Sequence, residues 1–75
     1  MYAIYSKPNC GACLQAKQLL EMEQLPFEYK QLGAHYNLNE LMELAPNAKS
    51  FPQVFKDGNC IGGFSDLVEY LNQQY

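Results

Sequence analysis

Two cysteines separated by two residues, in the run Cys10-Gly11-Ala12-Cys13, stand where the chain changes from an apolar run to a helical pattern. Sulfur atoms at this spacing can close a small disulfide ring or contribute two ligands to a metal. A helix start supplies unpaired N–H groups and a positive dipole end, which favour a thiolate over a thiol. The pair is therefore a redox centre, part of a metal site, or a spacing without function.

Size and charge narrow the class of protein. The chain has 75 residues, 48% of them apolar, which predicts a single folded domain over residues 1–75. The net charge is −3 and the five basic residues are scattered, so we expect no nucleic-acid partner. No run resembles a signal peptide or membrane span. An odd count of three cysteines argues against a disulfide scaffold and favours reduced thiols in the cytoplasm.

The first half of the chain predicts a strand, a helix and a second strand. The run at 2–6 predicts a buried strand, which ends at Lys7-Pro8-Asn9. Helical periodicity begins at Cys10 or Gly11 and ends by Gln24, because Pro26 disfavours helical angles in the residue before it. The predicted buried residues of this helix are Ala12, Ala16, Leu19 and Leu20. Alternation at 27–32 predicts a strand parallel to the first.

The second half predicts a helix, a hairpin and a last helix. Asn37 and Glu40 fit a capping box for a helix that Pro46-Asn47 ends. Its predicted buried residues are Leu38, Leu41, Met42 and Ala45. Strands at 51–55 and 60–61, joined through Asp57-Gly58, predict an antiparallel hairpin. After Gly62-Gly63, Ser65 is predicted to cap a helix whose buried face is Phe64, Leu67, Val68 and Leu71.

This order, β-α-β-α-β-β-α, predicts an α/β fold with a four-stranded mixed sheet. Its strands are apolar enough that helices must cover both faces. This is the thioredoxin-like arrangement. A C-x-x-C pair that follows the first strand of a βαβ unit is typical of its redox proteins.

Four segments together resemble the glutaredoxins, particularly the small phage and bacterial ones, over nearly the whole chain. They are Tyr5 to Cys13, Ala16-Lys17 with the leucines after it, Lys49 to Phe55, and Ile61 to Leu67. The resemblance implies a thiol–disulfide oxidoreductase that uses glutathione as reductant. It further implies disulfide-containing protein substrates such as ribonucleotide reductase, and a monomer in the cytoplasm (the host's, if phage-encoded).

The resemblance also implies a role for each matching residue. Cys10 would be the nucleophile and Cys13 the resolving thiol. Pro52 matches the family's cis-proline, and Phe51 would offer its backbone to the substrate. Lys7 and Lys49 match positions that hold the glycyl carboxylate of glutathione. The γ-glutamyl end would lie against Phe64, Ser65 and Asp66.

Departures from the family pattern leave alternatives open. Gly11-Ala12 replaces the usual Pro-Tyr, and Phe51 replaces the usual Val. A small residue at the motif proline accompanies members that hold a [2Fe–2S] cluster with glutathione, so cluster binding is one alternative. Reduction by thioredoxin reductase is another. A zinc site would need further ligands, and the spare Cys60 and His35 lack the paired spacing. We expect Cys60 to be buried, His35 to lie in a solvated loop, and no bound metal.

Overall fold

The computed structural model describes residues 1–74. The elements follow the order β-α-β-α-β-β-α. They are β1 (Tyr2–Ser6), α1 (Gly11–Met22), β2 (Phe27–Gln31), α2 (Leu38–Leu44), β3 (Gln53–Lys56), β4 (Asn59–Gly62) and α3 (Phe64–Gln74). The predicted α/β order is confirmed.

The sheet has the strand order β2-β1-β3-β4. β1 and β2 are parallel, with Tyr2 opposite Phe27, which confirms the predicted βαβ unit. β3 is antiparallel to both β1 and β4, so the sheet is mixed. The carboxyl end of β1 leads directly to the cysteine pair, and β3 follows the loop that contains Pro52.

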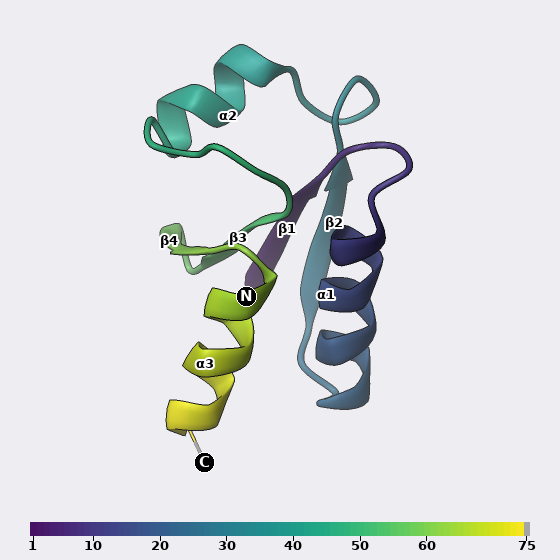
Figure 1. Cartoon of the computed structure of the whole chain (residues 1–75), viewed down its shortest axis with the longest axis vertical. Helices are drawn as coiled ribbons and strands as arrows, with labels where there is room; N and C mark the ends of the chain where they lie inside the picture. Colours follow the sequence, from purple (N-terminus) through teal and green to yellow (C-terminus); the bar gives the residue numbers. More distant parts are fainter. Residues whose placement is uncertain (75) are drawn as a thin grey trace.

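Helices pack against both faces of the sheet, as expected for apolar strands. On one face, Ile4 and Val54 pack with residues of α1 and α3. On the other face, Phe55 packs with Leu41 and Ala45 at α2. Figure 1 shows α2 apart from the other two helices. Ile4, Leu20, Leu41, Val54 and Leu67 are each at most 1% exposed, so both faces have a dry core.

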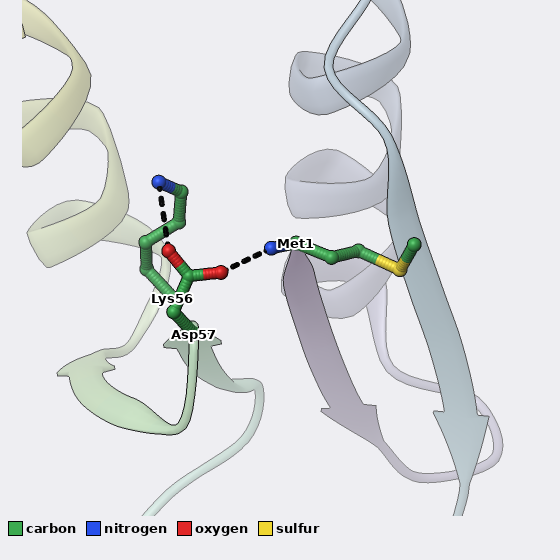
Figure 2. Close-up of polar contacts among 3 residues, drawn as sticks. All are labelled: Met1, Lys56 and Asp57. Carbon is green, nitrogen blue, oxygen red and sulfur yellow. Dashed lines mark hydrogen bonds and ion pairs between the residues drawn. The ribbon is translucent and has the colours of Figure 1, made fainter.

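The hairpin between β3 and β4 is tied to the start of β1. Asp57 and Gly58 both have positive φ angles, 51° and 86°, as the expected two-residue turn requires. The Asp57 carboxylate accepts a hydrogen bond from the Met1 amino group and lies 3.3 Å from Lys56 Nζ (Figure 2). These two cations, the amino group first, lower the pKa of Asp57.

Three details differ from the sequence predictions. Leu38 and Met42 are exposed, at 51% and 37%, because α2 has only seven residues and meets the sheet through Leu41 and the following Ala45. β3 begins at Gln53 instead of residue 51. α3 begins at Phe64, so Ser65 lies in its first turn and does not cap it.

No helix among residues 1–74 is both long enough and apolar enough to cross a bilayer.

Candidate active site

The cysteine pair forms the start of α1. Cys10 is the N-cap, with extended φ and ψ angles of −112° and 106°. Its sulfur accepts the N–H of Cys13 at 3.1 Å, the hydrogen bond that an oxygen makes at most N-caps. Asn9, at φ 57°, turns the chain from the preceding loop into the helix. The predicted helix start is thus confirmed, and a sulfur atom is its capping group.

The two cysteines are joined by a disulfide, with their Cα atoms 5.3 Å apart. Cys13 is fully buried, whereas Cys10 is only partly buried. A substrate from solution therefore meets Cys10 first. This asymmetry agrees with the sequence hypothesis in which Cys10 attacks and Cys13 resolves.

Two loops and the start of α3 converge beside the pair. The Phe51–Pro52 peptide is cis. The Lys7 ammonium lies 5.5 Å from the centre of the Phe51 ring, which brings the loop before Cys10 to the loop before Pro52. A Cβ atom placed on Gly63 would lie 3.6 Å from the carbonyl oxygen of Pro52, so the residue before α3 borders the same loop.

An open cleft of about 710 Å³ lies at this convergence. It contains most of the residues predicted to bind glutathione, together with Ala12 of the cysteine motif. The predicted residues that line it are Lys49, Phe51, Phe64, Ser65 and Asp66. Of the other two, Pro52 is buried within the loop before β3, and Lys7 lies over the Phe51 ring, which lines the cleft.

Asp66 has a defined position in the first turn of α3. Its Oδ2 atom accepts the N–H of Gly63 at 3.1 Å, so this carboxylate, and not Ser65, satisfies a free donor at the helix start. The approach is possible because Gly62 has no side chain. A Cβ atom there would lie 2.8 Å from Asp66 Cγ, and its φ of 125° also favours glycine. Asp66 itself is exposed.

Several residues of the cleft were not predicted from the sequence. One wall is formed by the segment 44–48, which begins at the last residue of α2. The floor contains Gln53 and Cys60. Cys60 is exposed, so the expectation that it is buried is wrong. β4 is an edge strand, which leaves the thiol open to the cleft and to a second hollow of about 510 Å³. The one signal for Gln53 in the sequence is that a polar residue directly follows a proline in an otherwise apolar predicted strand.

His35 lies outside the cleft. It is exposed in the loop after β2, as predicted, and its Nδ1 atom accepts the N–H of Gln31 at 3.0 Å. Within residues 1–74, no three His, Cys, Asp or Glu side chains gather in a way that could hold a metal ion.

Comparison with known proteins identifies relatives that match most of this chain. The glutaredoxin family model matches residues 3–61. Glutaredoxin-1 of Bos taurus is 34% identical over 73 residues, which span 87% of this chain and 67% of that protein. A hybrid peroxiredoxin of Haemophilus influenzae is 38% identical over 69 residues. Those residues span 92% of this chain but only 28% of that relative.

A solved structure has the same fold. The crystal structure of a buckwheat glutaredoxin–glutathione complex matches with a TM-score of 0.82. The match covers 97% of this chain and 69% of that one, at 22% identity. At this identity the likeness concerns the fold, and it confirms the predicted thioredoxin-like arrangement.

Proposed function

Because the chain belongs to the glutaredoxin family of thiol–disulfide oxidoreductases, we propose that it reduces disulfides with electrons from glutathione. One observation carries this proposal. The partly buried Cys10 caps α1, and the next residue but one, Ala12, lines a cleft with Lys49 and Asp66. Neither cysteine of the motif lines this pocket, but the motif borders it through Ala12, and the pocket has one cationic and one anionic side chain.

The proposed reaction uses the two cysteines in sequence. The Cys10 thiolate attacks one sulfur of a substrate disulfide, forms a mixed disulfide and releases the other sulfur as a thiolate, which takes a proton. The Cys13 thiolate then attacks Cys10, which releases the reduced substrate and leaves the Cys10–Cys13 disulfide. Two glutathione thiols return the pair to dithiol form and leave as glutathione disulfide. The α1 start favours the thiolate at Cys10 through its dipole and free N–H groups.

The charges of the cleft suit glutathione. The tripeptide carries two carboxylates and one ammonium group. Lys49, with Lys7 across the Phe51 ring, offers positive charge to the glycyl carboxylate. The first-turn N–H groups of α3 and the Asp66 carboxylate offer complementary groups to the γ-glutamyl carboxylate and ammonium. The backbone of Phe51 would pair with the cysteinyl residue between them.

A coupled assay tests the electron source. The oxidised chain is offered NADPH with glutathione and glutathione reductase, and in parallel NADPH with thioredoxin reductase. We expect NADPH consumption that requires glutathione. NADPH consumption with thioredoxin reductase alone would overturn the glutathione assignment and favour a redoxin that is reduced by thioredoxin reductase.

The protein partners follow from the same chemistry. We propose that the chain acts as a cytoplasmic monomer on proteins with accessible disulfides, ribonucleotide reductase among them. A ribonucleotide reductase deprived of other dithiol donors should turn over when the reduced chain is added. Turnover equal to that without the chain would remove this enzyme from its substrates.

Anaerobic purification distinguishes the reductase from a cluster carrier. A Cβ atom placed on Gly11 would meet no atom within 4 Å, so this position of the motif faces open space. We expect a colourless monomer with dithiol activity. A brown dimer with visible absorbance would instead favour a glutathione-ligated [2Fe–2S] cluster.

A further inference from the structure

The floor of the cleft contains a buried side-chain amide with no part in the chemistry above. Gln53 is 6% exposed and is, with Ser6, one of two buried polar residues among those described. Its Nε2 atom donates to the carbonyl oxygen of Ser50 at 2.8 Å. Its Oε1 atom lies 3.7 Å from the Cys60 thiol, which donates to it. The amide thus connects the loop before β3 to strand β4.

The loop that Gln53 holds makes few other hydrogen bonds. Within the described chain, the segment 49–52 makes no main-chain hydrogen bond to another main-chain group. The amide of Gln53 supplies the hydrogen bond to Ser50, in the middle of this segment. Lys49 and Phe51, on either side of Ser50, both line the cleft.

The geometry of the hairpin explains how Gln53 reaches Cys60. Side chains two residues apart on a strand share a face, so Gln53 lies on the face of Phe55. Phe55 is paired with Cys60, after a register shift between β3 and β4. Cys60 is therefore a diagonal neighbour of Gln53 on the same face, a distance that a long side chain can span.

We propose that Gln53 is a positioning residue for substrate binding: its amide, supported by Cys60, fixes the loop 49–51 so that Lys49 and the Phe51 backbone face the cleft. A buried amide held at both ends restricts its partners more than a solvated contact does. The step from the loop to glutathione rests on the function proposed above. The effect on the loop itself does not.

The test replaces the amide without changing the length of the side chain. In Gln53→Met we expect lower backbone NMR order parameters at residues 49–51, measured without glutathione. We also expect the KM for glutathione to rise about fivefold, the effect of one lost hydrogen bond, with kcat retained. Cys60→Ala keeps the bond to Ser50, so both effects should be smaller.

Ile4→Val controls for a general loss of stability. Ile4 is fully buried in the core between the sheet, α1 and α3, and it does not line the cleft. This variant should lower the melting temperature and leave both the order parameters of the loop and the KM unchanged. Unchanged order parameters at residues 49–51 in Gln53→Met, or equal changes in Gln53→Met and Ile4→Val, would overturn the proposal. A wild-type chain that ignores glutathione would overturn the proposed function instead, because the order parameters are measured without glutathione.

Discussion

The Lys7 ammonium lies over the ring of Phe51, 5.5 Å from its centre, and so joins the loop before Cys10 to the loop before Pro52. A cation above an aromatic face at an exposed site contributes about 0.5–1 kcal/mol. The ring thereby holds a positive charge at the edge of the cleft. Its family counterpart, a valine, would leave this lysine without an aromatic face.

We expect Phe51→Leu and Lys7→Met each to raise the KM for glutathione by about two- to fivefold. The double variant should be little worse than either, because both remove the same contact. The variant Lys7→Arg should retain the contact between the cation and the Phe51 ring. A matched control is Lys17→Met, since Lys17 lies 5.3 Å from the Tyr29 ring outside the cleft and should leave the KM unchanged. Fully additive effects of Lys7 and Phe51 would show that the contact is not used.

The two cysteines should fail in different ways when replaced. Cys10→Ser should abolish all activity, because the more accessible sulfur of the pair, the proposed nucleophile, is lost. Cys13→Ser should still reduce glutathione mixed disulfides, where a second glutathione resolves the intermediate, but not protein disulfides. The measurement is the rate with each substrate at saturating glutathione. Equal losses from both variants would contradict the order of attack.

Gly11→Pro should stabilise the protein. Gly11 is the first helical residue, where proline suits the backbone and an N–H is not needed, and the preceding Cys10 is already extended. A Cβ atom at this position meets nothing within 4 Å. We expect a gain of about 0.4–1 kcal/mol in the free energy of unfolding, chiefly because proline lowers the conformational entropy of the unfolded chain. Urea denaturation measures it, and a lower midpoint would count against the compatible geometry.

Gly62→Ala should have the opposite effect. The new Cβ atom would approach Asp66 Cγ to 2.8 Å at a φ of 125°, so either the carboxylate or the hairpin end must move. We expect a loss of about 1–3 kcal/mol in the free energy of unfolding and a weaker affinity for glutathione. Gly58→Ala is the control, because its φ of 86° is also positive while its Cβ position is open. Equal glutathione affinities in the two variants would show that Asp66 had not been displaced.

Stability should fall in alkaline solution through the buried tyrosines. Burial raises the pKa of Tyr36 to about 12, whereas an unfolded tyrosine titrates near 10. The folded state therefore holds its proton more tightly, and this contribution is complete below about pH 10 and lost as the pH rises towards about 12. Burial also raises the pKa of Tyr2, which adds to the same slope.

The variant Tyr36→Phe separates the contribution of Tyr36 to the alkaline loss of stability from that of Tyr2. Its hydroxyl donates to the Ser6 carbonyl at 2.6 Å, and this oxygen also accepts the N–H of Leu32 at 2.8 Å. The carbonyl thus keeps a partner in the variant, so the loss near neutral pH should be only about 0.5–1.5 kcal/mol. Urea denaturation at several alkaline pH values should show a shallower fall than in the wild type. An unchanged slope would assign the alkaline loss to other groups.

The sequence predicted the order of elements because each signal was local. Alternation in β2, the helical spacing of Ala16 and Leu20, and the Asp57-Gly58 turn depend on neighbouring residues alone. The face of α2 was harder to predict. In so short a helix, Leu38 and Met42 fit the apolar spacing as well as Leu41 does, and only contact with Phe55 and Tyr36 decides which side is buried.

The site was predictable where its residues lie in motifs and not where loops create the space. Lys49, Phe51 and the start of α3 belong to family segments that are readable in the sequence. The wall at 44–48 and the floor at Gln53 depend on how the loop returns from α2 to β3. Ser65 has the right residue type for a cap, but Asp66 reaches the Gly63 N–H first because Gly62 leaves room for its carboxylate.

Because the Cys10 sulfur caps α1, the stability of this helix is coupled to the reduction potential of the cysteine pair. Whatever free energy the helix start gives to the Cys10 thiolate favours the dithiol over the disulfide and raises the reduction potential. A tenfold shift in this balance corresponds to about 30 mV. α1 is anchored to the sheet through Ala16 and Leu20. A substitution that frays this helix far from both sulfurs would therefore lower the potential without altering either cysteine.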